Sequence, residues 1–498
     1  MEKITQDTLD LLKGAMANPS DELRKTVSTG TGLVPFDLQA PAKNLFPVAT
    51  PLRNVIPRVS GGVGTATNWK SIFGINGSGY DSMGWVPEGQ RSGRMNYSAV
   101  SKSASYKTLG EEDSITFEAI NAGRTFEDVQ ATGVVRILQK MMLKEENAIL
   151  GGNNSMSLSA PSAPTVSVGT GGSIGANTYN VYAVALTYEG YRNYTNLVAG
   201  GTLAIPTSQT ITGADNGTYS VSGGSSNKSS ATSTGAISAG STITASVPVI
   251  LGAMAYAWFV GAAGSETLQT VTTLNSVAFS ALTTTGQNAS AITANNSNNS
   301  LAFDGLLYSA FNGGAYVNSL ATGTAGVGST LTSSGRGSVV EIDNMLLSMW
   351  NQYQTSPTVL YVNAQELKNI TSKVLNNGSA PLLRYNQGAS GNDPYAITAN
   401  GQVSFYFNPF ALNGGSTIPV RIHPLLPPGT IVAWSENLPA QYQNNETPNV
   451  AEMKVRADYY SLEWPIRTRA REYGVYAEEV LAVYYPQSMG IINNISNG

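Results

Sequence analysis

The sequence predicts an α+β body that carries an inserted all-β unit. Three observations support this prediction: an extended stretch at residues 61–113, one long helix at residues 125–150, and a block at residues 153–300 with almost no charge. That block holds five of the 60 charged residues, although it makes up 148 of the 498 residues. The uneven charge indicates two kinds of folded material within one chain.

Composition excludes several classes of chemistry. The chain has no cysteine, one histidine (His423) and a formal net charge of −4. Disulfides, thiolate metal sites, cysteine nucleophiles and histidine-cluster metal sites are therefore excluded. The acidic balance argues against a body that coats nucleic acid tightly. The N-terminus lacks an apolar signal core and no stretch approaches about 18 apolar residues, so we expect neither a secretion signal nor a membrane span.

Residues 61–113 have the character of extended chain without a core of its own. The stretch is longer than an ordinary connection, and an isolated ribbon is marginally stable in water. We therefore expect a neighbouring molecule to hold it, through aromatic anchors and one acid: Trp69, Phe73, Trp85 and Glu88. For Trp85 the alternative is an ordinary place in the core of its own chain.

Residues 125–150 have the strongest helical pattern in the chain. Thr125 is positioned to cap this helix, two acids follow in the first turn, and Gly151 and Gly152 end it. Apolar residues recur along one side, so the helix needs a broad surface on which to lie.

The charge-poor block predicts a β-sandwich. Short β-like runs such as residues 179–187 and 255–260 alternate with glycine and asparagine, and their aromatic and branched side chains provide burial that a disordered segment lacks. The polar centre of the block, residues 213–241, is expected to be a mobile loop or an edge hairpin.

The rest of the chain has mixed α and β character. A helix at residues 339–353, a strand at 358–362 and a second helix at 364–375, with Asn363 as its cap, predict a compact α/β region. Residues 453–485 are strand-like with little interruption.

Three arginines near the end of the chain, Arg467, Arg469 and Arg471, occur at every second position. In a strand they would share one face, where three guanidinium groups repel one another unless carboxylates or phosphates pair with them. The candidate roles are a salt-bridge ladder with acids near residues 111–113 of another copy, a contact to DNA phosphates, or a solvated strand face.

No catalytic, cofactor or metal site is predicted. The Gly-x-Ser-x-Gly match at residues 171–175 lies in the glycine-rich block with no helix after it, so the sharp turn of a nucleophilic serine is missing. His423 precedes a proline and is expected to be structural.

Four segments carry a family resemblance when taken in order. They are Trp85-Val-Pro-Glu-Gly89, Lys144-Glu-Glu-Asn-Ala-Ile-Leu-Gly-Gly152, Val359-Leu-Tyr-Val-Asn-Ala-Gln-Glu-Leu367 and the strands of residues 455–485. Together they resemble the major capsid proteins of tailed bacteriophages with the HK97-like fold. The resemblance covers about residues 30–155 and 335–490, and the charge-poor block departs from it as an inserted Ig-like or fibronectin-type domain.

The resemblance implies a division of the chain into named parts. These are an N-terminal arm (1–60), an E-loop (61–113), a P-domain with a spine helix (114–155), an inserted Ig-like β-sandwich (156–300), a linker (301–335), an A-domain (336–440), and P-domain strands with the C-terminus (441–498). Only about the first 25 residues look helical, so scaffolding would come from a separate protein or not be needed.

The resemblance also implies a structural function without enzyme activity or cofactors. Copies would self-assemble into hexamers and pentamers of an icosahedral virion shell, in the cytoplasm of the host bacterium. The further partners would be scaffolding, portal and decoration proteins and weakly bound double-stranded DNA, with no membrane. An encapsulin-like cargo shell and a β-module surface or glycan-binding protein are the alternatives.

Overall fold

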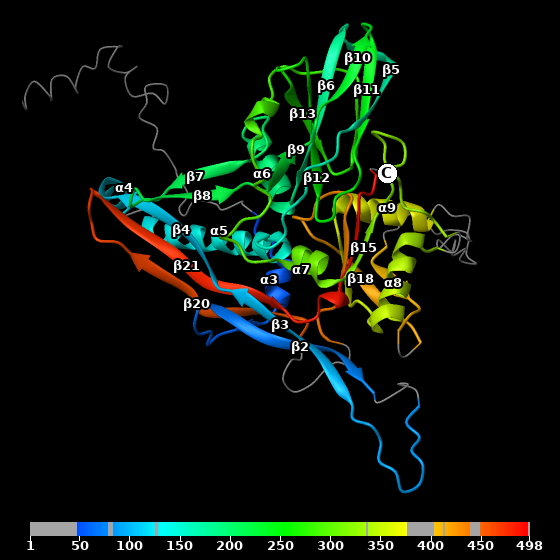
Figure 1. The fold of residues 1–498 in the computed structure, drawn as a ribbon. Coiled ribbons are helices and arrows are strands. Elements are labelled where there is room, and N and C mark those ends of the chain that lie inside the picture. The colour runs from blue at the N-terminus through cyan, green and yellow to red at the C-terminus, as the bar shows by residue number, and fades with distance from the viewer. Residues whose placement is uncertain are drawn as a thin grey trace, which may run out of the picture.

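The computed structural model describes residues 47–77, 83–124, 128–334, 337–375, 403–411, 414–438 and 449–496. The helical segment expected in the first 25 residues lies outside this part of the chain. The α+β class is confirmed, because helices pack on two sheets that each contain parallel and antiparallel strands, and a third region is built almost entirely from strands (Figure 1).

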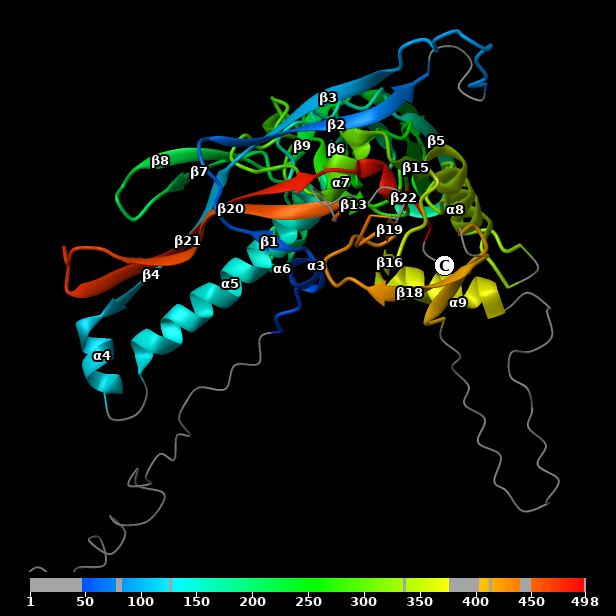
Figure 2. The same cartoon turned by 90° about the horizontal axis from the view of Figure 1, so that it is seen from below.

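One layer is a four-stranded sheet covered by the long helix. Its strand order is β1 (Arg58–Val59), β20 (Ala451–Glu463), β21 (Ala470–Val483) and β4 (Lys107–Thr116). Helix α5 (Val129–Gly151) lies along this sheet (Figure 2), and α4 (Phe117–Gly123) and α3 (Pro51–Val55) flank it. Ile137 and Met141 of α5 pack on Ile115, Tyr473 and Val475 of the sheet. The predicted broad surface for the helix is therefore this sheet.

The long helix begins later than predicted. Asp128 caps it, because its Oδ1 accepts the backbone N–H groups of Gln130 and Ala131 at 3.1 Å. Thr125, the expected cap, lies outside the described residues. The predicted end is confirmed: the helix stops at Gly151, and the N–H of Gly152 donates to the carbonyl of Ala148 at 2.9 Å.

A second layer is a six-stranded mixed sheet. Its order is β15 (Tyr316–Ser319), β22 (Gly490–Asn493), β19 (Ile431–Trp434), β16 (Val359–Val362), β18 (Ser416–Ile422) and β17 (Phe405–Asn408). Helices α7 (Leu306–Gly313), α8 (Val340–Tyr353) and α9 (Ala364–Leu375) accompany it. The predicted helix–strand–helix unit is confirmed, and Asn363 Oδ1 accepts the N–H of Gln365 at 3.0 Å as a cap for α9.

The charge-poor block forms two sheets that share a hydrophobic core. One sheet contains β10 (Thr232–Ile237), β6 (Asn177–Leu186), β12 (Ala255–Gly261), β13 (Thr267–Thr272) and β9 (Ser225–Lys228). The other contains β14 (Ser276–Phe279), β11 (Ser241–Ser246) and β5 (Thr165–Ile174). Trp258 and Val181 of the first sheet meet Ile243 and Phe279 of the second. The sheets stand away from the long helix (Figure 1), as an insertion between α5 and α7.

Two features of this block differ from the sequence prediction. Helix α6 (Tyr188–Ala199) interrupts the strands, and Thr187 caps it by accepting the N–H of Gly190 at 3.2 Å. Residues 213–241 are not simply a loop, because β9 and β10 pair with β6 there. The edge hairpin is confirmed in part: β8 (Thr218–Ser222) pairs with β7 (Ser208–Thr212) as a two-stranded ribbon.

The extended stretch before the long helix is a two-stranded hairpin. Strand β2 (Ala66–Asn76) pairs with β3 (Asn96–Ser105), and the loop beyond them continues outward from the body (Figures 1 and 2). This hairpin and its surroundings form the candidate site.

Candidate assembly interface

The outer half of the hairpin exposes large apolar side chains. Trp85 is 94% exposed, which excludes a place in the core of its own chain. Glu88 lies in the turn that follows and is also exposed. The other exposed apolar residues of the hairpin are Ile72, Ile75, Met83, Val86, Met95, Tyr97 and Val100. So many apolar groups in one projecting element are typical of a surface that another molecule covers.

The inner half of the hairpin is attached to the body. Trp69 is half-buried and its ring meets Tyr484 edge-on, with 5.5 Å between the ring centroids. Ala104 and Tyr106 pack against the central hydrophobic cluster. Trp69 therefore already has a place within its own chain, unlike Trp85. Phe73, the fourth predicted contact, lies where the register of β2 against β3 shifts, which is a local bulge.

The three arginines do not share a strand face, so that prediction is wrong. Arg467 and Arg469 lie in the turn between β20 and β21, and Arg471 alone is in β21. Arg469 Nη2 pairs with Glu118 Oε1 at 2.6 Å, and Arg471 Nη1 lies 3.8 Å from Glu463 Oε1. The turn was not predicted from the sequence, because residues 464–469 contain one proline and no glycine.

The acids expected to answer these arginines have other partners within the chain. Glu111 pairs with Lys144 of α5, and Glu112 accepts from the Tyr476 hydroxyl. Asp113 Oδ2 accepts from the Tyr473 hydroxyl at 3.4 Å. These contacts bind β4 to α5 and β21, so the three acids serve the packing of the sheet.

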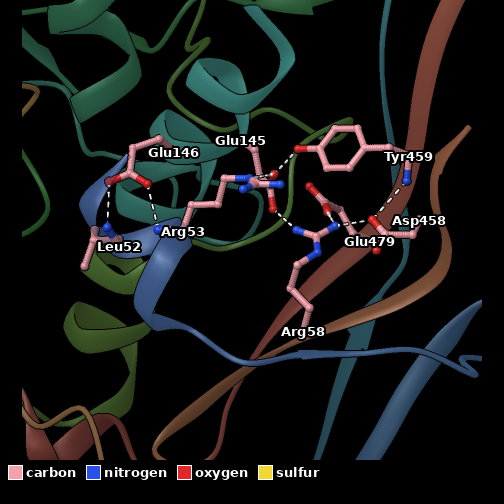
Figure 3. A network of polar contacts seen from close by, with 8 residues as sticks. All are labelled: Leu52, Arg53, Arg58, Glu145, Glu146, Asp458, Tyr459 and Glu479. Carbon is pink, nitrogen blue, oxygen red and sulfur yellow. Dashed lines mark hydrogen bonds and ion pairs between the residues drawn. The ribbon is translucent and has the colours of Figure 1, made fainter. Parts of the chain in front are cut away.

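A buried ionic cluster, missed from the sequence, joins the N-terminal segment to the long helix (Figure 3). The carboxylate of Glu145 is fully buried and accepts from Arg53 Nε at 2.6 Å, from Arg58 Nη1 and from the Tyr459 hydroxyl. Arg58 Nη2 also donates to Asp458 at 2.7 Å and to Glu479 at 3.1 Å. Four elements, α3, α5, β1 and β20, thus meet at the Glu145 carboxylate, and β21 joins them through the contact of Glu479 with Arg58.

The next residue on the helix, Glu146, ties two further segments together. Its carboxylate accepts the backbone N–H groups of Leu52 at 3.0 Å and Arg53 at 2.8 Å, so it acts as a cap for α3 from another element. His423 is fully buried, and its Nε2 lies 2.8 Å from Glu146. Its Nδ1 accepts the N–H of Leu425 at 3.3 Å, so Nε2 carries the proton. His423 is structural, as predicted.

Burial and charge act against each other in this cluster. Burial lowers the pKa of Arg58, but the attraction of Glu145 and the hydrogen bond to Asp458 outweigh burial, and the net shift is upward. Burial, reinforced by the charge of Glu145, raises the pKa of the Glu479 carboxyl above its ordinary range. One oxygen of Glu479, Oε1, is buried without a hydrogen-bond partner among the described residues. The signal in the sequence that could have indicated this cluster is the adjacent pair Glu145 and Glu146 within an amphipathic helix.

Two features that would support catalysis can be checked in the described part of the chain, a metal-ligand cluster and a nucleophilic turn. It contains no group of three or more histidine, aspartate or glutamate side chains that could hold a metal ion. Residues 171–175 lie in and just after β5 and are followed by another strand, not a helix. No helix there is both long and apolar enough to cross a bilayer.

Comparison with known proteins gives structural likenesses only. No family model and no curated protein matches the chain. The capsid of a native GTA particle is 9% identical with a TM-score of 0.42, over 95% of this chain and 99% of that chain. The capsid of cyanophage P-SCSP1u is 9% identical with a TM-score of 0.41, over 97% and 99%. An encapsulin complex from Synechococcus elongatus is 11% identical with a TM-score of 0.22, over 36% and 53%.

The GTA and cyanophage chains are both described as capsids. Their TM-scores lie below 0.5 and about one residue in ten is identical. The function proposed below therefore rests on the hairpin, the sheet and the ionic cluster of this chain.

Proposed function

We propose that this chain is the major capsid protein of a tailed phage, a subunit that self-assembles into the shell around packaged DNA. One observation carries the proposal: a long hairpin projects from the body and ends in a tryptophan, Trp85, that is 94% exposed. A two-stranded ribbon with so much exposed apolar surface is unfavourable in an isolated subunit. Contact with a second copy would remove that surface from water.

The geometry of the hairpin suits a shell subunit. The base of the ribbon, at the half-buried Trp69, contacts the body of its own chain, and the exposed end lies far along the ribbon from that base (Figure 2). The exposed end would therefore contact a surface of the next copy. Such a head-to-tail contact makes closed rings when the rotation between copies closes. Hexamers and pentamers of an icosahedral shell are assemblies of this kind. Truncation of one buried aromatic anchor costs about 2 kcal/mol or more.

We assign the parts of the chain accordingly, each as a proposal. The sheet with helix α5 is the P-domain (114–155 and 441–498), and the six-stranded sheet is the A-domain (336–440). The hairpin is the E-loop (61–113), preceded by an N-terminal arm (1–60). Residues 156–300 are an inserted Ig-like domain, joined by a linker (301–335). Trp69, Phe73, Trp85, Glu88, Arg467, Arg469 and Arg471 remain the proposed subunit contacts.

The proposed role needs no catalytic residue. Its partners are other copies in hexamers and pentamers, scaffolding, portal and decoration proteins, and weakly bound double-stranded DNA. Its place is the virion shell after assembly in the bacterial cytoplasm. An encapsulin-like shell differs from this role in its contents, since it would enclose an enzyme and not DNA.

The test is electron microscopy of the expressed full-length chain. We expect closed particles from the wild type and unassembled, soluble subunits from Trp85→Ala. Tyr219→Ala is the matched control, because Tyr219 is an exposed aromatic residue of the separate β7–β8 ribbon. Normal particles from Trp85→Ala, or a wild-type chain that forms neither capsomers nor particles under any salt condition, would contradict the proposal. Enzyme inside purified particles would favour the encapsulin-like shell.

A further inference from the structure

A cavity of about 330 Å³ lies between the base of the hairpin and the body. Trp69 and Lys102 line it from the hairpin. Asp304, Tyr308 and Asn312 line it from α7 and the preceding loop, and Leu481 from β21. It therefore has one wall in the hairpin and one in the main body, with both polar and apolar lining.

Most polar groups of the cavity wall are already paired. Asp304 Oδ1 accepts the N–H groups of Asn154 and Ser155 at 2.8 and 3.0 Å, and Asn312 Nδ2 donates to Ser155 Oγ at 2.8 Å. The Tyr308 hydroxyl accepts the N–H of Tyr188 at 2.9 Å. These contacts hold the wall in place, and Asp304 is the one carboxylate among the described lining residues.

One donor on the hairpin wall differs from the rest. The ammonium group of Lys102 lines the cavity, its residue is exposed, and it pairs with no carboxylate of the described chain. The indole nitrogen of Trp69 is itself buried, so Trp69 lines the cavity as apolar surface. An unpaired cation beside an apolar ring favours an occupant that carries a negative charge. The cavity thus suits an occupant that brings a carboxylate together with apolar surface.

The tip of the hairpin has this chemistry. The segment Trp85-Val-Pro-Glu-Gly89 offers one large aromatic ring, one proline and one carboxylate within five residues, all exposed. Strand β2 runs seven residues from Trp69 to Asn76, which is about 23 Å of extended chain. The loop that carries Trp85 continues outward beyond that point (Figure 2). A hairpin therefore presents its tip away from its own cavity.

We propose that each cavity receives the hairpin tip of a second copy of this chain, with Glu88 facing Lys102 and the Trp85 ring in the apolar part. The inference rests on the proposed capsid function and names the surface that the hairpin contacts. Each copy donates one tip and receives another, so the contact is head-to-tail and generates rings.

The turn between β20 and β21 is the rival occupant. It also combines an acid with exposed apolar groups, Glu463, Trp464 and Ile466. Its acid is already engaged, because Glu463 Oε1 lies 3.8 Å from Arg471 Nη1. Its backbone is held as well, since the N–H of Trp464 donates to the Glu472 carbonyl at 2.9 Å. The hairpin tip has the more accessible ring, since Trp85 is 94% and Trp464 38% exposed, and Glu88 pairs with no cation in the described ranges.

A charge-swap experiment tests the pairing. Particles and free subunits of the full chain are separated by sedimentation for Glu88→Lys, for Lys102→Glu and for the double variant. We expect each single change to raise the subunit concentration needed for assembly by about tenfold, and the double variant to return it to within about threefold of the wild type. Lys70→Glu is the control, since Lys70 is exposed on the same hairpin but does not line the cavity.

The outcomes separate this inference from the proposed function. If the wild type assembles but Lys102→Glu assembles equally well, or the double variant is no better than the single variants, the pairing is wrong while the capsid function stands. If Glu463→Lys, and not Glu88→Lys, rescues Lys102→Glu, the cavity belongs to the β20–β21 turn and the inference is overturned. If the wild type forms neither capsomers nor particles, the proposed function itself fails.

Discussion

Replacing Glu145 by glutamine tests whether the buried ionic cluster holds the N-terminal segment on the long helix. The carboxylate of Glu145 is fully buried, and the Arg53 and Arg58 side chains that it pairs with are 14% and 21% exposed. Glutamine keeps the shape but removes the charge and directs an amide N–H toward a guanidinium. Loss of one partner from a buried ion pair costs about 3 to 5 kcal/mol, and the partial exposure of both arginines favours the lower end.

Asp458→Asn is the matched control, because Asp458 pairs with the same guanidinium of Arg58 at 2.7 Å from an exposed position. Its side chain is 57% exposed, so the pair contributes less than about 1 kcal/mol after solvent screening. The two variants thus change the same arginine's partners, one buried and one at the surface.

The assay is hydrogen exchange on unassembled subunits, which measures local opening where global unfolding of a large chain is not two-state. The reporters are the N–H groups of Ile56, which donates to Leu52, and Met453, which donates to Pro57, both at 2.9 Å. Glu145→Gln should speed their exchange by roughly 150-fold, as expected for about 3 kcal/mol. Asp458→Asn should change it by no more than about fivefold. Equal effects of the two variants would refute the reasoning.

Three further predictions concern other contacts. Burial raises the pKa of Glu479, so the carboxyl binds its proton more tightly in the folded than in the unfolded chain. The free energy of unfolding should therefore fall as the pH rises above 4.5, the ordinary pKa of a glutamate. Glu479→Gln should reduce this dependence on pH, measured by denaturant titrations at several pH values. Gly133→Ala should destabilise the packing of α5 on the sheet by about 1 to 3 kcal/mol despite the better helix propensity of alanine, because the new Cβ would overlap the Tyr473 hydroxyl; unchanged exchange in α5 would contradict this. Arg469→Glu should change subunit stability by less than about 0.5 kcal/mol, since its side chain is 85% exposed and that of Glu118 is 58% exposed; any large effect should appear in the salt dependence of assembly, measured by light scattering.

Several features could be predicted because the forces behind them act over a few residues. The helix at 339–353 and the strand, cap and helix around Asn363 were placed to within a residue or two. The end of α5 at Gly151 and Gly152 was predicted correctly for the same reason, since apolar periodicity and capping are local signals. The exposure of Trp85 followed from a stretch too poor in apolar residues to bury itself.

Other features depended on contacts between distant residues. The prediction that the three arginines share one strand face was wrong because a turn begins after Glu463. The pairing of β21 with β4 was not predicted because it joins residues that lie more than 350 positions apart in the sequence. The ionic cluster joins Arg58, Glu145, Asp458 and Glu479 across four elements, and no local rule specifies which charges share a buried volume.

The sequence by itself determined where the main helices and strands form and that the hairpin lacks an interior, because capping, periodicity and composition act along the chain. The tertiary structure alone decided that Glu145 and Glu146 hold the N-terminal segment, and that a cavity lined by Lys102 and Trp69 lies at the hairpin base. Burial of a charge and closure of a cavity depend on which distant segments meet, and that is set by the packing of the whole chain.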